Sequence, residues 1–247
     1  MNLRFSVIVA FMFSLLPAGF SAERDTTVQS IFTLIYNQQF IKAEKALEQK
    51  NSNVDPFYHN ILKLDLFWWK YSLTKSKQDA KVLKQVLDEF DGSEQKTREA
   101  KINNLIKSSY EMRYEIKRYN FVGALIIRSD VRKQIEILRK EDLTFLGDKR
   151  KLFDFYLTLF DYFDENMNPF LFGSKSEKYL KSLSTLEIYS LDKDLILSTM
   201  AHYFLGRIYM KVEKQPEKGQ LHFRVLSQRF PENSLFKELA SGLNTNF

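Results

Sequence analysis

Side chains that commonly carry out chemistry are sparse in this chain of 247 residues. It has no cysteine, and its three histidines, His59, His202 and His222, stand singly on different expected helices. None of them has a carboxylate or a second histidine at metal-ligand spacing, and the sequence has neither a glycine-rich phosphate loop nor a nucleophile elbow. We therefore expect structural histidines, no catalytic residue, no metal and no cofactor.

The acidic residues with the most suggestive spacing are Asp161, Asp164 and Glu165. Asp161 and Asp164 share a helix face, where two carboxylates can act as acid and base. The long oxygen-rich loop of a calcium site is missing around them. We expect a solvated face. The alternative is an enzyme or small-ligand binder with a pocket among the aromatic residues of the fourth helical hairpin, using Asp161 or Asp164.

Aromatic residues are the stronger indication of function. Trp68 and Trp69 are adjacent, so on a helix they point about 100° apart and face different neighbours. Packing within and between hairpins accounts for such pairs, whereas the alternative is that one aromatic anchors a peptide on a concave face. Inward-facing Lys and Arg would suit an acidic or carboxylate-terminated peptide. The candidate partner-binding residues are Trp68, Trp69, Tyr110, Arg113, Phe170, Phe172 and Tyr203.

The elements that position these residues are all predicted to be α-helices. Apolar residues recur every three or four positions, and the 8 glycines and 5 prolines fall mostly between such stretches. Ser174 and Glu177 have the spacing of a capping box at the start of one helix. About five antiparallel hairpins are expected to stack into a curved α-solenoid, in one domain covering 23–247. The main expected helices cover 26–37, 40–50, 56–73, 78–90, 93–119, 121–139, 151–167, a stretch ending near 186, two within 201–230, and 233–243.

The segment 201–239 orders small, bulky and helix-breaking residues in a characteristic way. Gly206 lies beside Leu205 on one expected helix, Gly219 and Phe223 follow on the next, and Pro231 closes the unit. This order resembles the tetratricopeptide repeat (TPR), and a similar order recurs in 36–56. The resemblance implies hairpins that stack and bind a protein or peptide. More loosely, the Trp pair, the Pro-Phe-Leu-Phe motif at 169–172 and the C-terminal segment resemble exported helical-repeat proteins of Gram-negative bacteria, which implies a periplasmic or secreted binding protein.

The first 22 residues have the layout of a secretory signal peptide. A single charge at Arg4 precedes an apolar run over 5–16, and small residues follow Pro17. Cleavage is expected after Ser21 or Ala22. The run is too short to span a bilayer, which needs about 20 residues, and no later segment is apolar enough to do so. We expect an exported chain that is not a lipoprotein, since cysteine is absent.

The charge balance is modestly basic. Loss of the signal with its Arg4 lowers the net charge from +6 to +5, and the excess is spread among acidic residues, so we expect no nucleic-acid partner. The sequence thus predicts a non-catalytic scaffold of the cell envelope that binds a protein or peptide. Besides the small-ligand alternative, a structural subunit of an envelope assembly stays open.

Overall fold

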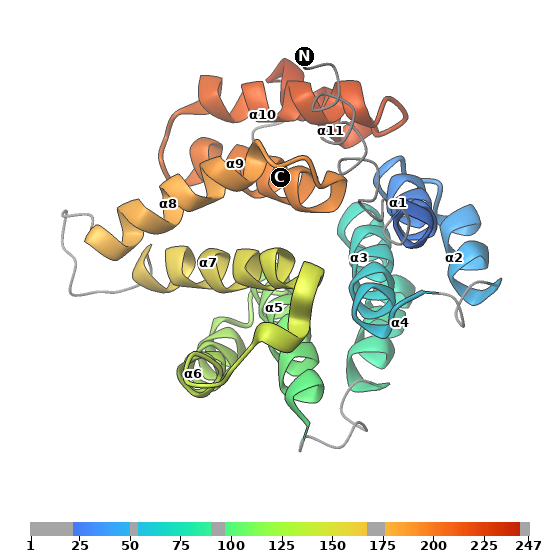
Figure 1. Ribbon diagram of the computed structural model, residues 1–247. Helices are drawn as coiled ribbons and strands as arrows, with labels where there is room; N and C mark the ends of the chain where they lie inside the picture. The colour runs from blue at the N-terminus through green and yellow to red at the C-terminus, as the bar shows by residue number, and fades with distance from the viewer. Residues whose placement is uncertain (1–21, 50–53, 90–96, 167–175, 243–247) are drawn as a thin grey trace, which may run out of the picture.

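The computed structural model describes residues 22–49, 54–89, 97–166 and 176–242. These residues contain eleven α-helices, one 3-10 helix (η3) and no strand, which confirms the all-α prediction (Figure 1). The elements are α1 (Ala22–Tyr36), α2 (Phe40–Gln49), α3 (Pro56–Thr74), α4 (Lys77–Glu89), α5 (Arg98–Lys117), α6 (Phe121–Leu138), η3 (Thr144–Lys149), α7 (Arg150–Asn166), α8 (Glu177–Ser190), α9 (Leu195–Lys211), α10 (Pro216–Arg229) and α11 (Ser234–Ser241).

Consecutive helices pair as α1/α2, α3/α4, α5/α6, α7/α8 and α9/α10. The first helix of each pair also contacts the first helix of the next, from α1 through α3, α5 and α7 to α9. In addition α1 contacts α9, which brings the first and fifth pairs together (Figure 1). The sequence did not determine the curvature of the expected stack, and the contact of α1 with α9 shows that the first and ninth helices lie next to each other.

Local capping explains where several helices begin. Asp55 accepts a hydrogen bond from the backbone N of Phe57 at 2.9 Å, ahead of Pro56 in the first turn of α3. The capping box expected from Ser174 and Glu177 was wrong, because α8 begins two residues later and has Tyr179 at the position that a capping box gives to Glu or Gln. Ser176, not Ser174, is the N-cap, and its hydroxyl accepts from the backbone N of Tyr179 at 3.0 Å. Ser174 lies outside the described residues.

The pair α9/α10 fits small residues against large ones. A Cβ added to Gly206 would lie 2.6 Å from Cε2 of Phe223, and one added to Gly219 would lie 2.8 Å from the carbonyl oxygen of Gly206. Both distances are shorter than van der Waals contact. The two helices therefore approach so closely that only glycine fits at these two positions.

Asn233 joins the two ends of the fold. Its fully buried side chain donates to the carbonyl oxygen of Tyr36 at 2.7 Å and accepts from Nε2 of Gln38 at 2.9 Å and from the backbone N of Phe236 at 3.0 Å. Next to it, the backbone N of Glu232 donates to the side chain of Asn37 at 3.1 Å. The turn after α1 is thus hydrogen-bonded to the turn before α11.

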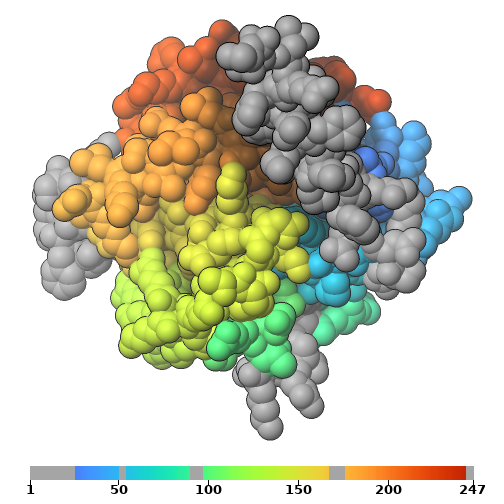
Figure 2. Space-filling model, in the orientation of Figure 1, coloured from blue at the N-terminus to red at the C-terminus, as the bar shows by residue number. Residues whose placement is uncertain are grey.

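Apolar packing is continuous through these helices, with one core that extends from Val28 to Leu239. In the space-filling view, residues of η3 and α7 lie in the middle of the visible face (Figure 2). Over the described part of the chain, no helix combines the length and the apolar character needed to cross a membrane.

Candidate binding cavity

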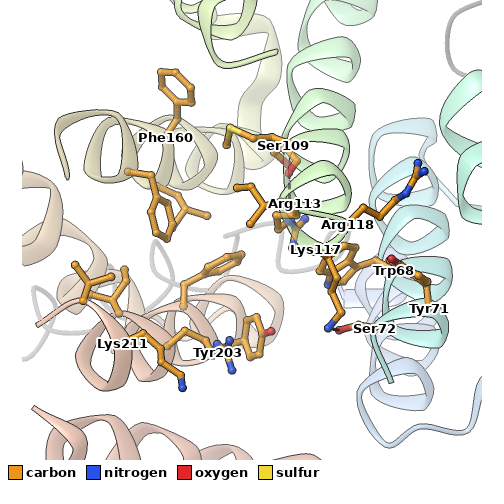
Figure 3. Close-up of a pocket in the computed structure, with 18 of the residues that line it drawn as sticks. Trp68, Tyr71, Ser72, Ser109, Arg113, Lys117, Arg118, Phe160, Tyr203 and Lys211 are labelled. Atoms are coloured by element: carbon orange, nitrogen blue, oxygen red, sulfur yellow. Dashed lines mark hydrogen bonds between the residues drawn. The ribbon is translucent and has the colours of Figure 1, made fainter. Parts of the chain in front are cut away.

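A cavity of about 830 Å³ lies among helices α3, α5, α7 and α9. Figure 3 shows α5 carrying Arg113 and Lys117 on one side, with Tyr203 and Lys211 on α9 across from them. Most of the wall is apolar or aromatic, and its volume is in the range of small-ligand sites, about 300–1,000 Å³. The apolar and aromatic lining residues include Trp68, Met112, Ile116, Tyr156, Leu159, Phe160, Phe163, Phe204 and Ile208.

The charged residues of the cavity are all of one sign. Six of the described residues that line it are basic and none is acidic. Two pairs, Arg113 with Lys117 and Arg207 with Lys211, are four residues apart, so each pair occupies one face of its helix. The remaining two basic residues are Lys75 and Arg118.

These cations repel one another. Burial, followed by the positive charges of Lys75 and Arg207, lowers the pKa of Lys117 to about 8. Burial and the charges of Arg207 and Lys214 also lower the pKa of Lys211. Lys117 donates to the hydroxyl of Ser72 at 3.4 Å, which is a neutral group. A bound anion would therefore offset the repulsion among these cations.

The guanidinium group of Arg113 lies over aromatic rings. Its guanidinium carbon lies 3.9 Å from the ring centre of Tyr110, 5.0 Å from Trp68 and 5.6 Å from Phe204. Its Nε donates to the carbonyl oxygen of Ser109 at 3.2 Å (Figure 3). Stacking and this hydrogen bond fix the orientation of the cation before any ligand arrives.

A buried polar cluster lies beneath Arg113 and joins four helices. Tyr110 donates to Asp65 at 2.6 Å, Tyr36 donates to Asp65 at 3.3 Å, and the hydroxyls of Tyr110 and Tyr156 are 3.4 Å apart. Burial raises the pKa of Asp65 to about 6, although the hydrogen bond from Tyr110 and the charge of Arg113 oppose that rise. The cluster connects α1, α3, α5 and α7 at one point of the core.

The structure brings three of the candidate binding residues together at the cavity, namely Trp68, Arg113 and Tyr203. Trp69, with only 2% of its surface exposed, packs instead against Tyr36, Tyr203 and Phe236. Tyr110 is also fully buried, and its hydroxyl donates to Asp65 in the polar cluster. Trp69 and Tyr110 therefore stabilise the core. Phe170 and Phe172 lie outside the described residues.

The expectation of a solvated face for the acidic residues of α7 was wrong for Asp164. Its side chain is buried and accepts from Arg128 and Arg132, both at 2.8 Å. Asp161 forms ion pairs with Arg139 and Lys178. Neither acid lines the cavity, so the enzyme alternative based on Asp161 or Asp164 has no support from their positions.

Two histidines that looked isolated in the sequence meet in space. Nδ1 of His202 lies 2.8 Å from Nδ1 of His222, and the ring of His222 stacks on Tyr209. Burial, then the neighbouring His222 and Arg229, lowers the pKa of His202 to about 4. The pair is therefore neutral at physiological pH, with one ring donating to the other. The described residues contain no group of three potential ligands for a metal ion.

Sequence reasoning missed most of the basic lining. Only Arg113 of the six was a candidate, although two signals were available; the residues missed are Lys75, Lys117, Arg118, Arg207 and Lys211. Arg113–Lys117 and Arg207–Lys211 repeat a four-residue spacing of cations, and each pair stands beside aromatic residues.

We compared the chain with protein-family models, with curated proteins and with solved structures, and found no significant match in any of the three.

Proposed function

We propose that this chain is a non-catalytic, TPR-like binding protein, exported to the cell envelope, that holds a segment of a protein or peptide in the cavity. The observation that carries the proposal is the lining of six basic and no acidic residues among aromatic walls. Such a surface suits a segment that ends in a carboxylate or bears acidic side chains and has apolar side chains beside them. The close fit of α10 on α9 at Gly206 and Gly219 supports the TPR-like character of the hairpins.

A matched pair of peptides tests the proposal. A fluorescent peptide with acidic residues and a C-terminal leucine is titrated into the protein, once with a free carboxylate and once amidated. We expect the free acid to bind on the order of tenfold more tightly, because it adds one charge-assisted contact. The double variant Arg207→Gln/Lys211→Gln should remove that preference, while Lys181→Gln/Lys193→Gln, outside the cavity, should keep it. Equal binding of both peptides would contradict the proposal.

A second candidate function is the binding of a small amphiphilic anion, favoured by the volume of the cavity. About 830 Å³ matches a small-ligand site, and Tyr156, Phe160 and Phe163 of the fourth hairpin supply apolar wall. A fluorescent fatty-acid analogue distinguishes the two functions. If it binds the cavity while neither peptide does, the ligand is a small amphiphile and not a protein segment.

A further inference from the structure

A cluster of exposed apolar side chains follows helix α5. Exposure is 82% for Tyr119, 58% for Phe121, 71% for Val122, 54% for Leu125 and 60% for Ile126. We call these five residues the α6 apolar face. The four on α6 share one side of the helix, and the ring of Tyr119 packs against that of Phe121 with centres 6.3 Å apart. A contiguous exposed cluster of this kind marks an interaction site.

Basic residues lie beside the Tyr119 end of the α6 apolar face. Arg118, directly before Tyr119, lines the cavity and also a second hollow along α4. We call the basic residues that line these two hollows around Arg118 the basic rim, comprising Lys75, Lys77, Lys81, Lys84, Lys117 and Arg118. The acids of the second hollow, Asp88 and Glu89, form ion pairs with Lys84 and Lys63.

We propose that the α6 apolar face docks on an anionic lipid surface. Aromatic and aliphatic side chains would enter the boundary between headgroups and acyl chains, where Tyr is favoured, and the basic rim would contact anionic headgroups. The four apolar side chains on α6 lie outside the cavity, whereas Lys75, Lys117 and Arg118 of the basic rim line it. Because Tyr119 lines the cavity as well, the cavity opens beside the docking surface.

Two features favour a lipid surface over a protein partner. Phe121, Val122, Leu125 and Ile126 are more than half exposed and none lines the cavity, so they project from the surface, whereas a helical peptide docks into a groove. A contact with a second copy would place the same patch on both sides and bring together two chains that both carry a net positive charge. Like charges at such a contact are unfavourable.

Vesicle sedimentation of the full-length chain tests the proposal. The vesicles contain phosphatidylcholine alone or with about one third phosphatidylglycerol. We expect binding to the anionic vesicles to be on the order of tenfold tighter and to weaken with salt. The variant Phe121→Ser/Val122→Ser/Leu125→Gln/Ile126→Gln should bind on the order of tenfold more weakly.

The matched control is Leu180→Gln/Ile188→Gln/Leu191→Gln, which removes exposed apolar side chains at 51%, 67% and 83% exposure on and just after α8. All variants keep the same N-terminal apolar run, so that run cannot produce a difference between them. Since every substituted side chain is exposed, circular dichroism should show unchanged folding.

A second pair of variants tests the role of charge. Lys77→Gln/Lys81→Gln/Arg118→Gln removes three positive charges from the basic rim, and its control, Lys140→Gln/Lys193→Gln/Lys237→Gln, removes three positive charges elsewhere. Only the first should lose the preference for anionic vesicles.

Three outcomes would each overturn the proposal. The wild type does not bind vesicles, the apolar-face variant binds as well as its control, or the two charge variants have equal effects. A further outcome would also overturn it: light scattering shows that the wild type dimerises with rising concentration and the apolar-face variant does not, while neither protein binds vesicles.

Discussion

Helix α9 belongs to two regions that are built in opposite ways. On one side, Gly206 accepts the ring of Phe223 and leaves no room for a methyl group. On another side, Tyr203, Arg207 and Lys211 line an open cavity in which cations face cations. The close packing of Gly206 against Phe223 stabilises the fold, whereas the like charges along the cavity destabilise it. The contrast indicates which side of the helix serves the fold and which serves a ligand.

The largest expected effect comes from filling the close contact in α9/α10. Gly219→Val adds a side chain whose Cβ would lie 2.8 Å from the backbone oxygen of Gly206, which cannot move without shifting the helix. We expect a loss of about 3 kcal/mol in the free energy of unfolding, measured with urea. In the control Gly123→Ala, the new Cβ meets only the side chain of Asn120, so the change should be about 1 kcal/mol or less. If Gly219→Val lowered the free energy of unfolding less than Gly123→Ala, the contact between α9 and α10 would not be the tightly packed region of the fold.

The buried carboxyl under the cavity predicts a pH dependence. The pKa of Asp65 is about 6 in the folded protein and 3.8 as the ordinary value. Between these values the folded state holds a proton that the unfolded chain releases, so stability falls as pH rises. Relative to Asp65→Asn, the wild type should lose about 2 kcal/mol between pH 4 and 6. Thermal unfolding at several pH values measures this difference, and parallel curves for the two proteins would contradict it.

The link between the two ends of the fold has a smaller expected effect. Asn233→Ala removes the N-cap of α11 and leaves the carbonyl group of Tyr36 without its buried donor, so we expect a loss of about 2 kcal/mol. Asn120→Ala removes the exposed N-cap of α6 and should lose about 1 kcal/mol. Urea unfolding compares them. Equal losses would mean that the buried bond to Tyr36 contributes nothing beyond capping.

In the cavity, removing a charge should stabilise the protein. Lys117→Met relieves repulsion from Lys75 and Arg207, and because Lys117 is only partly buried, solvent screening limits the gain to about 1 kcal/mol near neutral pH. The folded pKa of Lys117, about 8, lies below the ordinary 10.5, so wild-type stability should rise with pH across that interval and approach that of the variant. Binding of an anionic peptide should weaken in the variant. A destabilised variant would show that Lys117 supports the fold.

Sequence reasoning predicted most of the helices because several are bounded by a local signal, such as Pro56 at α3 or Pro231 after α10. It missed the 3-10 helix η3, where Gly147 adopts φ +53°. It also missed what depends on contacts between distant helices. Nothing local distinguishes Trp68 at the cavity from Trp69 in the core, and the ion pairs of Asp164 join residues 32 and 36 positions apart. The meeting of His202 and His222 depends in the same way on the packing of α9 against α10.

The bonds around Asn233 affect how the protein comes apart. In a row of repeats that touch only their neighbours, the outermost units can unravel first. Here residues 36–38 are hydrogen-bonded to residues 232–234, almost two hundred positions along the chain, so neither the first nor the last of the described helices is a free end. Fraying at one end must loosen the other, and the chain is therefore expected to open in a single cooperative step.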